Sequence, residues 1–541
     1  MQAWRDDAHA PATLFFTAFE SAPPKALDPL LRASCFGLLP GVHRILFEDG
    51  KVQLTLCIGE APAIGREIDI AADSVLIDHL DLWGGKHIAR LCKRGTALSW
   101  HHANPDAMAE LQQAGIQVDA QTSAGVFEPH WTPKSSLRSS HTHAAKTQNP
   151  HAVVIGAGLS GAAVAHSLAT RGWFVEVIDR GTALGAGASG LPAGIFATHV
   201  SPDNNVLSRI TRDGVRATLQ RAQKLLTDGT HWQLSQLLEH RYAGKRQLPE
   251  GDAWPAEGHA WSTEATEDQK LACGLTAQSP ALWHPLAGWL QTPAFVKAQL
   301  THPNIKVRTH CDVHTLRKSN GMWQLLDSQG ETLASASEVI LASAHDCQAL
   351  LDTIDVSAEH SAMKRPTIPA TALRGQVTWG SMTALSTNLQ TKLPACPVNG
   401  HGSFIGNLPS LNTNSNDKFW IVGSSFQRND FDLSSRQEDL KSNLQQWSEL
   451  MPALKDDIAQ GVDTELTHSW VSVRSALPDR VPAVGAFSHP DFQGLQVCTG
   501  MGARGISWSV LCGELLAAHL NHEPLPIAAS LASRLAASRF G

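Results

Sequence analysis

The stretch AVVIGAGLSGAAVAHSLATRGWFVEVID, residues 152–179, decides the fold of the chain around it. It starts with a short apolar run, Ala152–Ile155, which predicts a buried strand, and continues into an apolar helix predicted over Ala162–Thr170. A second apolar run, Phe174–Ile178, predicts the next strand. Strand, helix and strand in this order indicate a βαβ unit, and therefore a parallel sheet in an α/β domain.

The turn between the first strand and the helix, Gly156-Ala-Gly158-Leu-Ser-Gly161, has the spacing of a dinucleotide-binding loop. The first glycine permits the tight turn, the second lets backbone approach a pyrophosphate, and the third lets the helix pack closely on the sheet. Free N–H groups and a partial positive charge at the helix N-terminus attract phosphates. Asp179, about 20 residues further on, can accept hydrogen bonds from ribose hydroxyls.

A fortuitous glycine-rich turn would not place strand, loop, helix, strand and acid in register, so this stretch predicts dinucleotide binding. The candidate cofactor-binding residues in it are Gly156, Gly158, Ser160, Gly161, Asp179 and Arg180.

A second glycine-rich turn, CTGMGARG, occupies Cys498–Gly505. It follows a strand-like run, Leu495–Cys498, and precedes a long apolar helix predicted over Ile506–Leu520. The N-terminus of that helix would point at something anionic or electron-rich. An ordinary glycine-bounded turn is the alternative. The candidate residues here are Gly500, Gly502, Arg504 and Gly505.

Size and composition limit the remaining possibilities. A chain of 541 residues is too long for one ordinary core, so at least two domains are expected. A net charge of −7 excludes a broadly basic protein, although a local basic patch is enough to hold a few phosphates. The chain has no signal peptide and no run approaching the roughly 18 apolar residues of a membrane helix, so a cytoplasmic protein is expected.

The nine cysteines are scattered without a C-x-x-C pair, which predicts buried thiols and neither disulfides nor a metal site. His101-His102 and His141–His143 lack a carboxylate or cysteine at ligand spacing, so they are interpreted as loop histidines. The segment 131–150 is rich in Ser, Thr, His and Lys and predicts an inter-domain linker.

The segment before this linker shows an α/β pattern. Strands are predicted at Ala12–Ala18, Val52–Ile58 and Ser74–Ile77, and a helix at Ala107–Ala114. No glycine-rich strand-to-helix turn occurs among these elements.

Several ordered motifs together resemble one family, the bifunctional tRNA 5-methylaminomethyl-2-thiouridine biosynthesis proteins. Its C-terminal half is a flavoprotein of the D-amino-acid oxidase class. The motifs are GAGASGLPAGIF (185–196), SPDNNVLSRITRDG (201–214), HPLAGWLQTP (284–293), LRGQV (373–377), GSSFQRNDFD (423–432), VRSALPDRVPAVG (473–485) and GMGARGISWSVLCGELLAA (500–518). The resemblance adds Ser189 and Gly190 to the cofactor-binding candidates. Leu191 departs from the family, which commonly has Asn there.

The resemblance implies an α/β fold in which a Rossmann-type FAD-binding domain carries an inserted, mainly antiparallel substrate domain. The FAD-binding parts are expected at about 151–230, 300–365 and 466–541, and the substrate domain at about 230–300 and 365–465. The implied reaction is the oxidative removal of the carboxymethyl group from carboxymethylaminomethyl-uridine at the wobble position of tRNA. FAD is thus the expected cofactor and tRNA the expected partner.

Residues 1–130 resemble the family's methyltransferase half only in part. LFFTAFESAP (14–23) is similar to the strand whose acid binds the ribose of S-adenosylmethionine, which would make Glu20 that acid. LLPGVHRILFEDGKVQLTL (38–56) also resembles that half, whereas 77–96 follow it loosely. The glycine loop expected before Glu20 is missing. We therefore expect a truncated methyltransferase-like domain, without S-adenosylmethionine binding or methyl transfer.

Arg474 matches the position where flavin oxidases of this class place the arginine that binds the substrate carboxylate; a structural arginine that ties a strand to the flavin domain is the alternative. Arg504 is the second catalytic candidate, able to touch flavin or substrate; a solvent-exposed neighbour of the helix N-cap is the alternative. Arg374, Arg209 and Arg212 are interpreted as ion-pairing residues ahead of substrate or phosphate contacts. Tyr242 is the chain's one tyrosine, which weakly favours a wide site.

Two other functions are consistent with the sequence. One is an oxidase or dehydrogenase of a free amino acid such as glycine or sarcosine. The other is a non-catalytic, flavin-bearing tRNA-binding protein. The oligomeric state and the electron acceptor have no signature in the sequence.

Overall fold

The computed structural model describes residues 2–7, 10–24, 34–119, 121–132, 150–241, 247–411 and 415–541. The chain divides into two compact units. The first unit comprises Met1–Gln148 together with Ala518–Ser533, and the second comprises Asn149–Ala517 together with Arg534–Gly541. Most of the expected linker, and Tyr242, lie outside the described residues.

The first unit contains two small sheets. One has the order β1-β3-β2, with β1 (Leu14–Glu20) parallel to β3 (Val52–Ile58) and β2 (Gly41–Phe47) antiparallel to it. The other has the order β4-β5-β7-β6. Its strands are β4 (Ala72–His79), β5 (Cys92–His102), β6 (Ile116–Asp119) and β7 (Ala124–Phe127). The helices are α1 (Gln2–Asp6), α3 (Ala61–Ile64), α4 (Gly85–Leu91) and α5 (Pro105–Gln113).

A segment near the C-terminus completes this first unit. The buried guanidinium of Arg44 on β2 donates to the carbonyl oxygens of Pro524 at 2.7 Å and Leu525 at 3.2 Å. The backbone N–H of Ser530, in α16 (Ala529–Leu535), donates to Glu67. Residues 518–533 were expected within the oxidoreductase domain, so their membership of the first unit is a difference that these contacts explain.

The second unit is built on a six-stranded sheet of order β16-β9-β8-β20-β28-β27. Its strands are β8 (His151–Ile155), β9 (Phe174–Ile178), β16 (Ile305–Arg308), β20 (Glu338–Leu341), β27 (Ala483–Ala486) and β28 (Leu495–Thr499). Every pairing in it is parallel except that of β27 with β28. The strand order reverses beside β8, and ligands of such sheets bind where this reversal opens a crevice at the carboxyl ends of the strands.

The helices of this part are α6 (Leu159–Ala169), α7 (Val206–Leu225), α10 (Thr292–Leu300), α11 (Cys347–Asp352) and α15 (Gly505–Asn521). A small antiparallel sheet of β17 (Thr315–Ser319), β18 (Met322–Leu326) and β19 (Thr332–Ala336) follows β16. The predicted βαβ unit is thus present as β8, α6 and β9, and the predicted α/β fold is confirmed.

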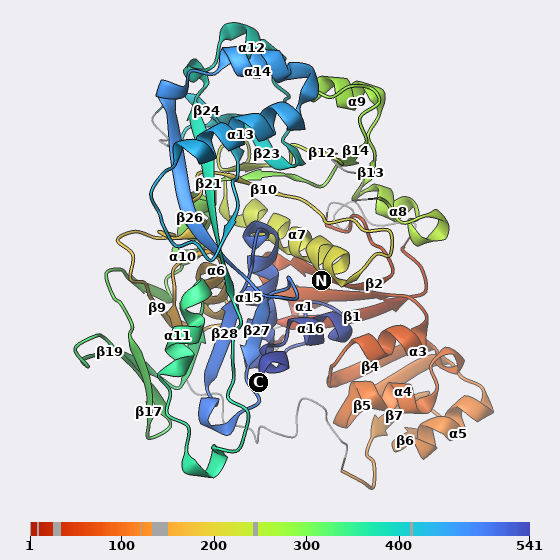
Figure 1. Cartoon of the computed structure of the whole chain (residues 1–541). Helices are drawn as coiled ribbons and strands as arrows, with labels where there is room; N and C mark the ends of the chain where they lie inside the picture. Colours follow the sequence, from red (N-terminus) through yellow and green to blue (C-terminus); the bar gives the residue numbers. More distant parts are fainter. Residues whose placement is uncertain are drawn as a thin grey trace. The chain divides into compact units, whose positions relative to one another are not determined.

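A nine-stranded sheet forms the other half of the second unit. Its strands are β12 (Leu237–His240), β13 (Thr263–Glu264), β14 (Ala281–His284), β21 (Thr371–Ser381), β22 (Val398–Gly400), β23 (Gly402–Pro409), β24 (Lys418–Gly423), β25 (Gln427–Arg428) and β26 (Thr467–Ala476). All pairings except β12 with β22 are antiparallel. Helices α12 (Thr387–Lys392), α13 (Gln437–Leu450) and α14 (Lys455–Gly461) lie against it, at the top of Figure 1.

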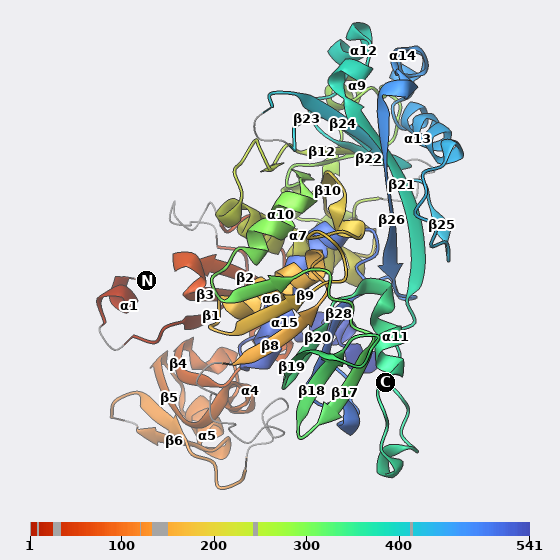
Figure 2. The ribbon, with the colours of Figure 1, turned by 90° about the vertical axis from the view of Figure 1, so that its left-hand side faces the viewer.

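Strand β26 links the two halves of this unit. It was expected in the FAD-binding part, yet it pairs with β21 over ten residues, from Thr371↔Ala476 to Gly380↔Thr467. Figure 2 shows the two strands running side by side. A shorter antiparallel sheet of β10 (Gly194–Phe196), β11 (Trp232–Gln233) and β15 (Gly288–Leu290) completes the unit, together with α8 (Ala256–His259) and α9 (Glu267–Ala272).

Candidate flavin and substrate site

The glycine loop after β8 is packed so closely that its glycines are required. Gly156 has φ +112°, and a Cβ on it would lie 2.6 Å from the carbonyl oxygen of Ala342, just after β20. A Cβ on Gly161 would lie 1.8 Å from the carbonyl oxygen of Gly156. The loop therefore holds α6 against the sheet with its N-terminus at the carboxyl ends of β8 and β20.

The carboxylate of Asp179 closes this loop from the end of β9. Its two oxygens accept hydrogen bonds from the backbone N–H groups of Ala157 at 2.6 Å and Gly181 at 2.7 Å. Arg180 lies beside it, and its guanidinium forms a half-exposed ion pair with Asp346 at 2.8 Å.

The loop that precedes β10 folds back onto the start of α6. The hydroxyl of Ser189 accepts a hydrogen bond from the backbone N–H of Leu159 at 2.9 Å, and a Cβ on Gly158 would lie 2.9 Å from the same hydroxyl. Gly190, at the end of the short helix η4 (Ala188–Gly190), is pressed against Trp470 on β26. Leu191 packs its side chain into an apolar cluster with Val377 and Trp379.

The second glycine-rich turn meets these elements. Gly500 and Gly502 have φ +79° and +55°, and the backbone N–H of Gly502 donates to the carbonyl oxygen of Ser475 at 2.8 Å. Gly505 opens α15 with its Cβ position 3.4 Å from Leu159, at the start of α6. The two glycine-rich turns, distant in sequence, are therefore adjacent.

Arg474 lies on the strand to which this turn is pinned. Residues alternate between the faces of a strand, so Arg474 shares a face of β26 with Trp470, which contacts Gly190. Its Nη2 donates to the hydroxyl of Ser424 at 3.3 Å and passes over Gly375 of β21, where a Cβ would lie 3.0 Å away.

Within the described parts of the chain, no carboxylate pairs with Arg474, and burial alone lowers its pKa. A guanidinium stays charged in proteins, and a cation placed away from water is stabilised by an anion. This half-buried arginine is therefore suited to bind the carboxylate of a ligand.

Arg504 contacts a different element. Its guanidinium lies over the ring of Trp508, 5.4 Å from the centroid, and Trp508 packs against Gly214 of α7. Arg474 thus lies on the strand that contacts Gly190 through Trp470 and Gly502 through Ser475, whereas the guanidinium of Arg504 stacks on Trp508 of its own helix.

Arg374 and Arg212 are engaged inside the protein. Arg374 is fully buried and pairs with Asp439 of α13 at 2.6 Å. Arg212 donates to Asn204 at 2.6 Å and lies over Trp254. Ser424, Gly375 and Trp470 were not identified from the sequence, although Gly375 and Ser424 lie within the LRGQV and GSSFQRNDFD motifs.

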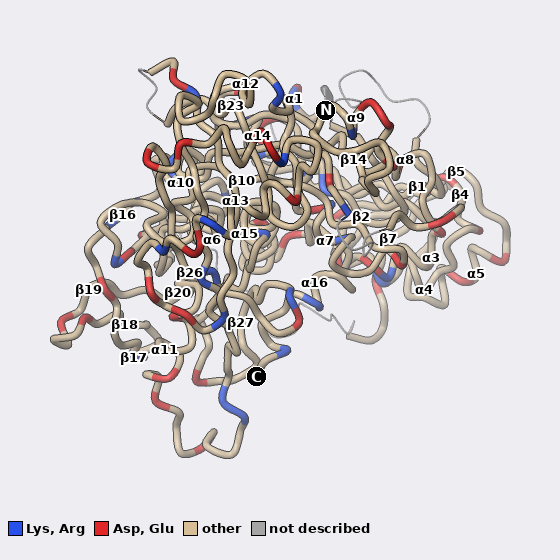
Figure 3. Tube along the Cα trace, turned by 45° about the horizontal axis from the view of Figure 1, so that its top comes forward, with Lys and Arg blue, Asp and Glu red and all other residues tan. Residues whose placement is uncertain are grey.

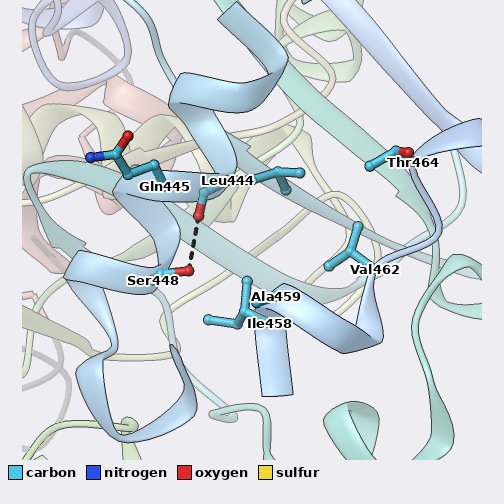
Figure 4. A pocket seen from close by; sticks show the side chains of 7 residues that line it. All are labelled: Leu444, Gln445, Ser448, Ile458, Ala459, Val462 and Thr464. Carbon is cyan, nitrogen blue, oxygen red and sulfur yellow. Dashed lines mark hydrogen bonds between the residues drawn. The ribbon is translucent and has the colours of Figure 1, made fainter. Parts of the chain in front are cut away.

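The cysteines, the potential metal ligands, the helices, the surface charges and the pocket of the described residues indicate no second site. All nine cysteines are free thiols, and the ranges that the structure describes contain no cluster of three or more potential metal ligands. None of the helices in those ranges is long and apolar enough to cross a membrane. Lys and Arg are interspersed with Asp and Glu along the trace in Figure 3. A depression of about 240 Å³ between α13 and α14, lined by Ser448, Ile458 and Val462 among others, has no charged wall (Figure 4).

Comparison with known proteins agrees with this geometry. The family model described as FAD dependent oxidoreductase matches residues 151–519. The glycine loop, in which Gly156 and Gly161 leave no room for a Cβ, and the N-terminus of α6 suit the pyrophosphate of FAD. The protein is an FAD-dependent oxidoreductase.

Relatives that match almost the whole chain narrow the assignment. The tRNA 5-methylaminomethyl-2-thiouridine biosynthesis bifunctional protein of Polaromonas sp. (strain JS666) is 40% identical over 99% of this chain and 87% of its own. The protein of the same name from Polaromonas naphthalenivorans is 38% identical over 97% and 85%. The chain belongs to this family of bifunctional proteins.

A solved structure agrees on the fold. Glycine oxidase from Geobacillus kaustophilus aligns with a TM-score of 0.51 at 18% identity, covering 69% of this chain and 96% of the oxidase.

Proposed function

We propose that this enzyme oxidatively removes the carboxymethyl group from 5-carboxymethylaminomethyl-(2-thio)uridine at the wobble position of tRNA, giving 5-aminomethyl-(2-thio)uridine. The relatives' name refers to biosynthesis of 5-methylaminomethyl-2-thiouridine in tRNA, which differs from the proposed 2-thiouridine product by one N-methyl group. The observation that carries the proposal is Arg474, a half-buried cation without an acidic partner among the described residues, on the strand whose Ser475 accepts a hydrogen bond from Gly502 of the second glycine-rich turn.

The substrate contains the group N–CH₂–COO⁻, and Arg474 is assigned the carboxylate. Binding it in a two-pronged hydrogen-bonded pair would fix the CH₂ at a set distance from the turn at Gly500–Gly505. Ser424 holds the guanidinium in place, and Gly375 leaves the space that it occupies. The bound FAD would supply the two-electron oxidation of this CH₂–N bond, and hydrolysis of the oxidised C=N group would release aminomethyl-uridine and glyoxylate.

In this proposal Arg504 positions a helix and does not bind the substrate. From its position over Trp508 it would hold the start of α15, whose N-terminal partial charge favours an electron-rich ligand. The cofactor-binding assignments to Ser160, Ser189 and Gly190 rest on their place at the start of α6 and in η4.

The test is a reduction experiment under anaerobic conditions. The purified yellow protein is mixed with tRNA that carries carboxymethylaminomethyl-uridine, and in parallel with unmodified tRNA, glycine and sarcosine. Loss of flavin absorbance with the modified tRNA alone, with aminomethyl-uridine in the nuclease digest, is the expected result. Reduction by the free amino acids alone would make the protein an amino-acid oxidoreductase, and reduction by none of them a flavin-bearing binding protein. A protein without flavin contradicts the proposal.

A further inference from the structure

A loop beside Arg474 exposes three large apolar side chains. Phe426, just before β25, is 54% exposed. Phe431 and Leu433, between β25 and α13, are 59% and 62% exposed. We call residues 426–433 the aromatic loop. Contiguous exposed apolar surface is uncommon on proteins and marks contact sites.

The aromatic loop is firmly anchored, so its exposure does not follow from a loose backbone. The buried guanidinium of Arg374 donates to the carbonyl oxygens of Asp432 at 2.5 Å and Ser434 at 2.7 Å. Arg436 forms ion pairs with Asp430 and Asp432, both at 2.7 Å. These bonds fix the backbone from beneath and leave the rings of Phe426 and Phe431 on the outside.

Each of the two rings adjoins a part of the candidate site. The ring of Phe426 lies under the guanidinium of Arg474, 6.0 Å from centroid to Cζ. The ring of Phe431 meets that of His345 edge-on at 5.4 Å. His345 belongs to η7 (Ala344–Asp346), which follows β20 at the carboxyl edge of the flavin sheet. The aromatic loop therefore borders the position assigned to the substrate carboxylate.

The proposed substrate determines what the aromatic loop must contact. A wobble uridine is flanked by unpaired bases of the anticodon loop, and its modified side arm must reach Arg474. Proteins hold unpaired bases chiefly by stacking aromatic rings on them, with cations nearby for the backbone. Arg436 pairs with both Asp430 and Asp432 and so offsets one of their two negative charges, and the exposed Arg428 balances the other.

We propose that Phe426 and Phe431 stack on unpaired bases of the anticodon loop and thereby position the wobble uridine at Arg474. This inference rests on the proposed function and adds the surface that recognises the RNA beyond the reacting group. Phe426 and Phe431 are thus positioning residues.

The test compares two substrates of different size. One is an anticodon stem-loop RNA that carries carboxymethylaminomethyl-uridine, and the other is the corresponding mononucleoside. Phe431→Ala and Phe426→Ala are each expected to raise KM for the stem-loop about tenfold or more, since stacking on one base contributes that much. For Phe431→Ala, the kcat for both substrates, KM for the nucleoside and the flavin content should stay unchanged, whereas Phe426→Ala, whose ring lies under the guanidinium of Arg474, should raise KM for the nucleoside as well. Phe431→Trp should restore KM for the stem-loop.

Phe174→Ala is the matched control, because Phe174 is 43% exposed at the start of β9, away from the carboxyl edge of the sheet. Unchanged KM for the stem-loop in Phe431→Ala, or equal losses with both substrates, would overturn the inference while the proposed function stands. If the wild-type protein oxidises neither substrate, the affinity of each variant for labelled stem-loop RNA is measured by fluorescence anisotropy instead. Weaker binding by Phe431→Ala than by Phe174→Ala then supports the aromatic surface, and equal binding rejects it.

Discussion

At the scale of single residues, the position of Arg474 is explained by ligand binding better than by stability. Burial lowers its pKa, and no acid among the described residues offsets the cost of placing the charge there. Arg374, one strand away, shows the contrast, since its buried guanidinium pairs with Asp439 and three other acceptors. A carboxylate ligand would give Arg474 the negative charge and hydrogen-bond acceptors that the carboxylate of Asp439 gives Arg374.

Replacement of Arg474 should therefore affect substrate binding first. Arg474→Ala is expected to raise KM for the carboxymethylaminomethyl substrate by about 100-fold, which corresponds to about 2.7 kcal/mol and to a hydrogen-bonded charged contact. Arg474→Lys should lie in between, because an ammonium keeps the charge without the two-pronged geometry. Steady-state kinetics measure the effect. Arg317→Ala, at an exposed arginine on β17, is the control for loss of a cation, and an equal rise in its KM would contradict the assignment.

Gly375 gives a second way to disturb the same guanidinium without removing it. A Cβ at this position would lie 3.0 Å from Nη2 of Arg474 and 3.3 Å from the Ser424 hydroxyl. Gly375→Ala should displace the guanidinium and raise KM about tenfold, a loss of about 1.4 kcal/mol. Gly380→Ala, on the same strand but 3.3 Å from Leu466, is the matched control and should keep KM. Equal KM in both variants would show that Arg474 does not depend on this space.

Sequence alone could not find these contacts. Arg474 was identified through a motif, whereas Gly375 and Ser424 became neighbours of Arg474 only through the pairing of β21 with β26. The partner of Arg374 is Asp439, 65 residues later on α13, so the burial of Arg374 was equally hidden. Local sequence patterns indicate which residues could bind a ligand, but strand pairing between distant segments decides which of them come into contact.

At the scale of elements, the βαβ unit was predictable because its signals are local. The apolar runs matched β8 and β9 within one residue, and the glycines are enforced by contacts inside the loop. Strand β26 was assigned to the FAD-binding part because its neighbours in sequence belong there. Its pairing with β21 depends on residues about 100 positions away, which periodicity does not report.

Three helices of the flavin half are tied by one buried acid. Glu514 on α15 pairs with Arg171 at 2.9 Å, after α6, and with Arg221 at 2.6 Å, on α7. Burial raises the pKa of Glu514, but the two guanidinium groups outweigh it and lower the pKa to about 2. The folded state therefore favours the carboxylate, and the stability that this contributes is present above the unfolded pKa of about 4.3 and lost as the pH falls toward 2.

Glu514→Gln should lower the free energy of unfolding at pH 7 by about 3 kcal/mol, both because the pKa difference is lost and because two buried cations keep no counter-charge. The difference from wild type should shrink between pH 4.5 and pH 3. Urea unfolding at several pH values measures it. The exposed Glu331→Gln should match wild type throughout, and a pH-independent difference for Glu514→Gln would reject the electrostatic origin.

At the scale of the whole molecule, the sequence indicated a boundary near residue 150 but not the return of residues 518–533 to the first unit. That return depends on Arg44 of β2 reaching carbonyl groups 480 positions later. Backbone carbonyls have no sequence signature, so such a contact is invisible before folding. The first unit thus includes the end of α15 and the segment that follows it in the sequence.

The first unit is expected not to bind S-adenosylmethionine. Glu20, the acid that the resemblance assigns to the ribose, stands exposed at the end of β1. Among the described residues of its sheet, β2 leads directly toward β3, and β3 leads through Gly59 into α3, a helix of four residues. Such short elements offer neither a glycine cradle nor a helix long enough to present its N-terminus to the methionine end.

Calorimetric titration of the full chain with S-adenosylmethionine should therefore give no binding heat. Incubation with the methyl-labelled compound should leave unlabelled the aminomethyl-uridine tRNA that the enzyme itself produces. The same preparation's flavin reduction by modified tRNA serves as the positive control for folded protein. Saturable binding that Glu20→Ala abolishes would contradict this prediction, because it would show that Glu20 belongs to a working S-adenosylmethionine site.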